Sequence, residues 1–129
     1  MAAGGLYVFQ DNPLIKQFSQ ELNPLPLHIG GAPNDAVLVA SSVVLETNRQ
    51  RAEQGNLPPL TQNVKLQAAA KAKAEDMFEG QYFEHVSPSG VDPGELVKTA
   101  GYDYIVTGEN LILGNFKDEK EVVQLWMDS

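Results

Sequence analysis

A single strand-like segment among predicted helices is the feature that most constrains the fold of this chain. Residues 102–114, YDYIVTGENLILG, are rich in β-branched and aromatic side chains, and the middle of this segment predicts a strand. The backbone groups on both edges of a strand need partners, so one strand cannot make a sheet. The set of elements in these 129 residues therefore looks incomplete, and no internal repeat accounts for the shortfall.

Two long segments predict helices. The first begins after Asn34 or Asp35, either of which can cap it, and Gly55 is expected to end it in the left-handed conformation. The second covers about residues 62–79, and Gly80 closes it. Its apolar face is expected to consist of Leu66, Ala70, Ala74, Met77 and Phe78, with Lys65, Lys71, Lys73 and Glu75 elsewhere.

Two shorter helices are expected nearer the end of the chain. Asp92 followed by proline predicts a helix start, and this helix ends at Gly101. Asp118 with Glu121 resembles a capping box and begins the last helix. Val122, Val123 and Trp126 lie on one side of that helix, and Trp126 is interpreted as a core residue.

Asn48 falls on the apolar stripe of the first helix, where an unpaired amide would be costly. We therefore expect it to bind a neighbouring stretch of backbone. Residues 1–33 differ in character, because four prolines and a diglycine interrupt every candidate helix. They predict a leader or linker with one brief helix at about 14–22, and His28 is interpreted as a loop residue.

The formal charge of −8 argues against binding nucleic acid, which needs clustered Lys and Arg. The chain has no cysteine, so it has neither disulfides nor thiolate ligands or nucleophiles. Its first residues lack the basic and apolar regions of a signal peptide. No stretch approaches the ~20 apolar residues of a transmembrane segment.

Several motifs occur in an order that is specific in combination. They are N-x-x-R at Asn48 to Arg51, LPPL, A-x-x-x-A-x-x-M in the second helix, FEHVSPSG, TGEN and the closing WMDS. In this order they resemble the CAP or SCP domain of cysteine-rich secretory proteins, antigen 5 and pathogenesis-related 1 proteins. The resemblance covers residues 36–129 and is best with the cysteine-free bacterial branch.

The resemblance implies an α+β fold, a three-layer α-β-α sandwich around a central antiparallel sheet. We expect residues 34–129 to be the N-terminal portion of such a domain, with helices and the first strand. Bacterial relatives continue past W-M-x-S into Pro-x-His-Arg and further strands, so the C-terminal strands are expected to be lacking.

The resemblance also implies which residues line a central cleft. The family's first histidine falls on His85 and its first glutamate on Glu109. The second glutamate position is Ser129, which is not acidic, and the second histidine would lie beyond the chain. At most two of the four groups are therefore present. We assign structural roles to Asn48, Arg51, Asn110 and Trp126.

His85 and Glu109 alone can support only limited chemistry. Stable zinc sites use three or four ligands, so a divalent metal such as zinc at His85 would be weakly held, and no cofactor is required. Ser87 and Ser89 lie in a turn-forming segment, and adjacency in sequence does not give a nucleophile its base. Two interpretations of His85 and Glu109 remain. They are either a hydrogen-bonded pair that only pins the loop to the strand, or part of a cleft that binds a ligand.

Three hypotheses follow for function. The first is a secreted binding module, in the extracellular space or cell envelope, whose cleft holds a small molecule, a lipid or a metal ion. The second is a metal-dependent, peptidase-like hydrolase, which would need the missing histidine and a replacement for the second glutamate. The third is a non-catalytic fragment that another chain completes, or that forms oligomers through its unpaired strand edge. The fold alone does not name a reaction.

Overall fold

A computed structural model describes residues 36–129 of the chain. The expected linker at residues 1–33, its brief helix, His28 and the two candidate caps Asn34 and Asp35 lie outside the described residues. The described part contains four helices, α2 (Ala40–Gly55), α3 (Val64–Gly80), α4 (Pro93–Thr99) and α5 (Glu119–Met127). Within residues 36–129, no helix has the length and apolar character needed to cross a membrane.

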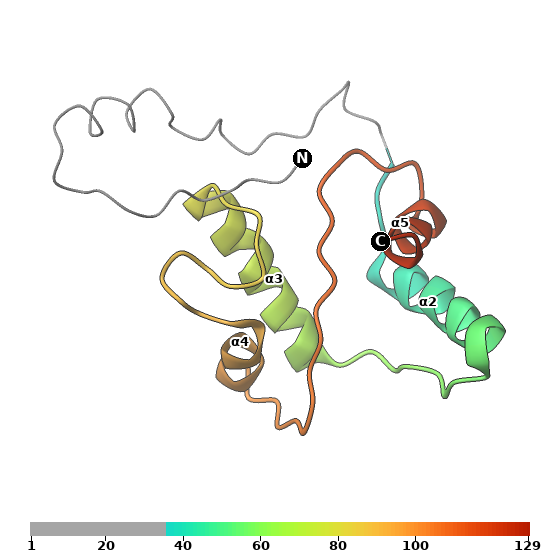
Figure 1. The fold of residues 1–129 in the computed structure, drawn as a ribbon, viewed down its shortest axis with the longest axis horizontal. Helices are drawn as coiled ribbons and strands as arrows, with labels where there is room; N and C mark the ends of the chain where they lie inside the picture. Colours follow the sequence, from blue (N-terminus) through green and yellow to red (C-terminus); the bar gives the residue numbers. More distant parts are fainter. Residues whose placement is uncertain (1–35) are drawn as a thin grey trace, which may run out of the picture.

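The helices form two pairs, α2 with α5 and α3 with α4. The connection from α4 to α5, orange to red in Figure 1, runs between the two pairs. Residues 102–114 lie in this connection, so their side chains can meet groups from both helix pairs.

The start of α2 differs from the prediction that Asn34 or Asp35 caps it. Val39 occupies the N-cap position, and it has no side-chain cap. Its backbone N–H instead donates to Oε1 of Glu119, at 2.6 Å, from the first turn of α5. The carboxylate of Glu119 thus caps the N-terminus of α2 from a distant part of the sequence. Capping rules consider only neighbouring residues, so they do not predict this contact.

The ends of α2 and α3 were predicted one residue too early. Gly55 and Gly80 are the last helical residues, and the left-handed positions belong to Asn56, with φ of 51°, and Gln81, with φ of 53°. Asparagine tolerates this conformation because its short polar side chain can bond locally, whereas glutamine adopts it less readily. At Gln81 the left-handed position is occupied without a glycine, and the side-chain amide of Gln81 donates to the carbonyl of Phe78 in the last turn of α3.

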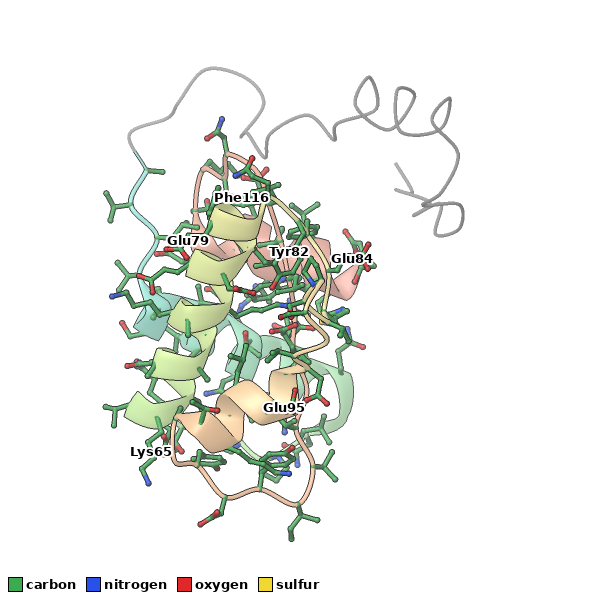
Figure 2. All side chains as sticks on the ribbon, turned by 90° about the vertical axis from the view of Figure 1, so that its left-hand side faces the viewer. Lys65, Glu79, Tyr82, Glu84, Glu95 and Phe116 are labelled. Carbon is green, nitrogen blue, oxygen red and sulfur yellow. The ribbon has the colours of Figure 1, made fainter. Side chains whose placement is uncertain are left out.

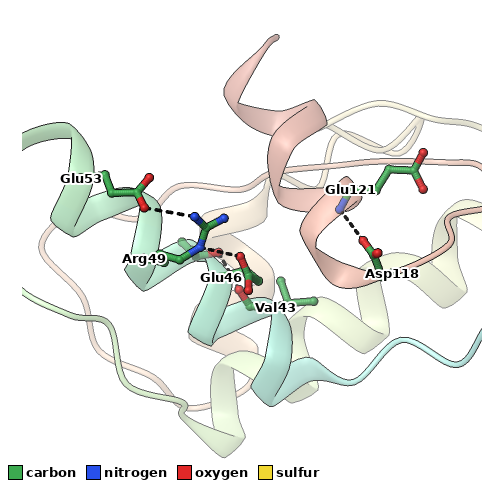
Figure 3. Close-up of polar contacts among 7 residues, drawn as sticks. Val43, Glu46, Arg49, Glu53, Asp118 and Glu121 are labelled. Atoms are coloured by element: carbon green, nitrogen blue, oxygen red, sulfur yellow. Dashed lines mark hydrogen bonds and ion pairs between the residues drawn. The ribbon is translucent and has the colours of Figure 1, made fainter.

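Local capping chemistry starts α4 and α5 as predicted. Asp92 and Glu95 form a reciprocal capping box at α4, with proline in its first turn. At α5 the carboxylate of Asp118 accepts from the N–H of Glu121 at 2.8 Å, as Figure 3 shows. The Glu121 side chain accepts from the N–H of Lys117 rather than from that of the cap residue. These contacts satisfy donors that the first turn leaves free.

The predicted strand at residues 102–114 is not formed among the described residues, which contain no strand. No backbone-to-backbone hydrogen bond joins residues 103–114 to another described segment. A strand exists only with a partner, and the described part of the chain offers none. Ile105 is 99% exposed and Val106 is 86% exposed. The helices of the expected sandwich are therefore described, and its sheet is not.

The buried stripe of α3 also differs from the prediction. Ala69, Lys73 and Met77 are buried at four-residue spacing, whereas Phe78 is 47% exposed. Ala70 and Ala74 are exposed as well. The buried face of α3 is thus rotated by about one residue from the predicted apolar face, and Lys73 lies at its centre. Trp126, interpreted as core, is only half-buried.

Candidate functional site

His85 and Glu109 lie side by side although 24 positions separate them. His85 belongs to the loop after α3, and Glu109 belongs to segment 102–114. Nδ1 of His85 is 2.8 Å from Oε1 of Glu109. The histidine side chain is 61% exposed and the glutamate side chain 16% exposed. An ionised carboxylate can only accept, so Nδ1 is the donor in this contact and Nε2 points away from the carboxylate.

The pair borders a cavity of about 330 Å³. Figure 2 shows Glu84 at the outer edge of the molecule, where its side chain is exposed. The lining thus combines carboxylate, imidazole, amide and hydroxyl groups with apolar side chains. The lining consists of Phe83, Glu84, His85, Glu109, Asn110, Leu111, Trp126 and Ser129.

The end of α5 closes one side of this cavity. The indole Nε1 of Trp126 donates to the carbonyl of Leu111 at 3.2 Å and so joins α5 to segment 102–114. The hydroxyl of Ser129 donates to the carbonyl of Trp126 at 2.7 Å. Ser129, the position that the resemblance assigns to a second glutamate, therefore lines the same cavity as His85 and Glu109.

Asn110 occupies a junction between cavities. It lines the cavity at His85 and two further cavities of about 250 Å³ and 460 Å³. Its side chain is exposed and has no hydrogen-bond partner within residues 36–129. The sequence interpretation gave Asn110 the task of satisfying backbone groups. Asn110 thus borders the cavity without a hydrogen bond to the backbone of the described residues.

The serines of the histidine loop are engaged with one another. The hydroxyl oxygens of Ser87 and Ser89 are 2.8 Å apart, and Oγ of Ser87 also accepts from the N–H of Val91 at 3.0 Å. Ser87 is 7% exposed. These contacts hold the turn of the loop together, and among residues 36–129 no hydrogen bond links either hydroxyl to His85. Neither Ser87 nor Ser89 therefore has, among residues 36–129, the histidine base that a nucleophile needs.

Asn48 and Arg51 bind the linker between α2 and α3. The Asn48 amide donates to the carbonyl of Leu60 at 2.9 Å and accepts from the N–H of the same residue at 2.7 Å. Nε of Arg51 donates to the carbonyl of Pro58 at 3.0 Å. The two side chains thus fix the course of the LPPL stretch relative to α2.

The sequence interpretation missed Lys73 and Tyr82. The Lys73 ammonium donates to the carbonyl of His85 at 2.8 Å and to the Tyr82 hydroxyl at 3.3 Å. The Tyr82 hydroxyl donates to Asp76. Burial first, then the hydrogen bond to Asp76 and the negative charges of Asp76 and Glu109, together raise the pKa of Tyr82 to about 12. The four-residue spacing Ala69–Lys73–Met77 was the signal that Lys73 faces inward.

The described residues do not form a zinc site. His85 and Glu109 are two donors already hydrogen-bonded to each other. Residues 36–129 contain no group of three histidine, cysteine, aspartate or glutamate side chains close enough to share an ion. Two ligands leave most of the coordination sphere of zinc to water, so the expected metal ligand His85 lacks the set it would need here.

Comparisons with known proteins give consistent results. The model of the Cysteine-rich secretory protein family, CAP, matches residues 44–129. The uncharacterised protein YkwD of Bacillus subtilis (strain 168) is 39% identical over 98 residues, which are 76% of this chain and 37% of that protein. The chain therefore spans well under half the length of this relative. No solved structure matches the chain.

Proposed function

The chain belongs to the cysteine-rich secretory protein (CAP) family, and we propose that it is a binding module whose cleft at His85 and Glu109 holds a small organic ligand. One observation carries the proposal: the 2.8 Å contact between Nδ1 and the carboxylate at the edge of a cavity of about 330 Å³. This contact leaves Nε2 of His85 with no described partner, and cavities with a few convergent polar groups are the usual ligand sites of proteins.

The groups at the opening define the class of ligand. The carboxylates of Glu84 and Glu109 accept hydrogen bonds, Nε2 of His85 accepts when the ring is neutral, and the Asn110 amide can accept or donate. Phe83 and Trp126 supply apolar surface beside them. The proposed ligand therefore carries hydroxyl or ammonium donors on an apolar body, and it is neutral or cationic because the carboxylates repel anions. A lipid with an uncharged or cationic head group belongs to this class.

Family membership also supports a location and a complete fold. The family takes its name from secretory proteins, so we place this protein outside the cell or in the cell envelope. We propose that residues 34–129 are part of an α-β-α sandwich in which segment 102–114 is a sheet strand. YkwD is uncharacterised and supplies no ligand.

A second candidate function rests on the exposure of segment 102–114. Ile105 and Val106 are almost fully exposed, and the backbone beside them has no described partner. An exposed, unpaired and apolar stretch is suited to pair with a strand of another chain. The protein would then be an assembly piece rather than a ligand carrier. A hydrolase has less support, because the described residues supply neither a metal site nor an activated serine.

Matched small probes test the binding proposal. In other proteins a cavity of about 150 Å³ is large enough to hold benzene. The cavity at His85 is larger, about 330 Å³, so it has room for benzylamine, benzyl alcohol or benzoate. In two-dimensional NMR titrations of the full 129-residue chain, we expect benzylamine and benzyl alcohol to shift the signals of His85, Glu109 and the Trp126 indole. Dissociation constants of about 1–10 mM are expected for ligands of this size.

Two comparisons make this test specific. Benzoate, with the same ring and a negative charge, should bind at least about threefold more weakly than benzylamine. His85→Ala should abolish the shifts, whereas Ser41→Ala, a substitution on the exposed surface of α2, should leave them unchanged. Equal binding of all three probes, or shifts that avoid the cavity lining, would contradict the proposal. Zn²⁺ added alone is a fourth probe. It tests whether residues outside 36–129 complete a metal site with His85 and Glu109.

A further inference from the structure

We propose that Lys73 is a positioning residue for His85, acting through the main-chain carbonyl of the histidine. The inference rests on the proposed function of the cleft, because it assigns to Lys73 the task of presenting the imidazole there. Lys73 comes from the middle of α3 and Glu109 from segment 102–114. The histidine is therefore anchored at its backbone by one element and at its ring by another.

The burial of Lys73 is the first step of the argument. Its side chain is 2% exposed and is the largest fully buried side chain of residues 36–129. A buried ammonium costs free energy unless it is paired or well hydrogen-bonded. In the described part of the chain no carboxylate lies within ion-pair distance of it. An apolar side chain would fill this place on the stripe between Ala69 and Met77 at lower cost.

The partners of the ammonium indicate what it does there. Nζ lies 2.8 Å from the carbonyl of His85, 3.3 Å from the Tyr82 hydroxyl and 4.9 Å from the centre of the Tyr82 ring. The Tyr82 hydroxyl in turn donates a hydrogen bond to the carboxylate of Asp76, one turn further along α3 than Lys73. Asp76, Tyr82 and Lys73 thus form a chain of donors and acceptors that ends on His85. It fixes both ends of the turn from Tyr82 to His85 against a rigid helix.

The imidazole has few other contacts that could orient it. His85 is 61% exposed, and its contact with Glu109 is the only hydrogen bond of the ring among residues 36–129. The far side of the loop is fixed separately, by Ser87 and Val91. The direction in which the ring leaves the backbone therefore depends on the carbonyl that Lys73 holds. A site is precise when its groups are locked by such supporting contacts.

Replacing the ammonium while keeping its apolar stem tests this role. In Lys73→Met, long-range proton–nitrogen NMR of His85 measures how much of the ring carries its proton on Nδ1. We expect this fraction to fall at least about twofold relative to the wild type. The matched control is Lys71→Met, since Lys71 is exposed and pairs with Glu75 on the outer face. A lysine that only stabilises the fold would leave the proton position unchanged in the folded molecules.

The outcomes separate cleanly. Folded Lys73→Met with the wild-type proton position at His85 overturns the proposal. If Lys73→Met does not fold, Tyr82→Phe, which removes one partner of the ammonium, should lower the Nδ1–H fraction in the same direction. In the wild type, the Lys73 ammonium protons should also exchange slowly and show cross-relaxation with Tyr82. Rapid exchange of these protons, or an unchanged histidine in Tyr82→Phe, overturns it as well.

This readout uses no ligand, so it distinguishes the inference from the proposed function. If the wild type binds none of the benzyl probes but Lys73→Met still moves the histidine proton, the binding proposal fails and the positioning role stands. If both hold, benzylamine should bind Lys73→Met about tenfold more weakly than it binds Lys71→Met.

Discussion

At the scale of single residues, Tyr82 gives the protein a predicted dependence on alkaline pH. Its pKa is raised from 10.0 to about 12, first by burial and then by Asp76. The folded state therefore holds the phenolic proton more tightly than the unfolded state does. This contribution to stability is fully present below about pH 10 and is lost as the pH rises toward about 12.

Urea unfolding at several pH values between about 9 and about 12 measures this contribution. Other tyrosines and the lysines also titrate there, so the relevant quantity is the difference between the wild type and Tyr82→Phe. We expect the wild type to lose more stability than the variant across this range. Parallel pH profiles for the two proteins would show that the Tyr82 proton is not held by the fold.

Asn48 supports a second prediction at this scale. Asn48→Ala removes both hydrogen bonds to the backbone of Leu60 and leaves those groups to water. We expect the free energy of unfolding to fall by about 1 kcal/mol. Ser41→Ala, elsewhere on the same helix, is the control and should change it little. A loss no larger than that of the control would show that the linker is held without Asn48.

The site residues show what sequence could and could not predict. His85 and Glu109 were named from motifs, and the structure brings them into hydrogen-bond contact. Lys73 was predicted to lie off the apolar face of the second helix, whereas it is buried. Its burial depends on acceptors from Tyr82 and His85, which are brought there by the course of the loop. A helical pattern carries no information on that course.

At the scale of elements, α4 depends on a glycine beneath a tyrosine. A Cβ at Gly94 would overlap the hydroxyl of Tyr104, which lies over the start of the helix. We expect Gly94→Ala to lower the free energy of unfolding by about 1–3 kcal/mol, despite the higher helix propensity of alanine. Thermal or urea unfolding measures the loss.

Two variants control this prediction. Gly108→Ala should be nearly neutral, because no atom lies within 4 Å of its added Cβ. In a Tyr104→Phe background, Gly94→Ala should cost less, since the overlapping oxygen is gone. An equal cost in both backgrounds would mean that the tyrosine does not lie over Gly94 in solution.

Helix boundaries and the missing strand illustrate two limits of prediction at this scale. The starts of α4 and α5 were predicted from Asp92 with its proline and from Asp118 with Glu121, because these residues act within a few positions of one another. The start of α2 was not predicted, because the N–H of its cap residue Val39 is bound by Glu119, which lies 80 positions away. The strand at residues 102–114 was predicted from composition, but pairing is a property of two segments.

At the scale of the whole molecule, the described part of the chain buries little apolar surface. Its buried apolar residues are Ala69, Met77, Val97, Val122 and Val123. Large side chains such as Leu45, Ile105 and Val106 are mostly exposed. Apolar burial is the main favourable term in folding, so the 129-residue chain by itself should be only marginally stable.

We expect the isolated chain either to unfold with a free energy below about 5 kcal/mol or to associate with itself. Light scattering after size-exclusion chromatography, combined with a thermal melt, distinguishes these states. Self-association that is lost on Ile105→Lys would support pairing through segment 102–114. A monomer with a cooperative melt above about 65 °C would contradict the expected marginal stability.

The central claim is that His85 and Glu109 meet in solution and set the proton of the imidazole. Long-range proton–nitrogen NMR of His85, in the wild type and in Glu109→Ala, tests this claim most directly. The account predicts a proton on Nδ1 in the wild type and a shift of that proton toward Nε2 when the carboxylate is removed. A wild-type ring already protonated on Nε2, or one that Glu109→Ala leaves unchanged, would contradict it.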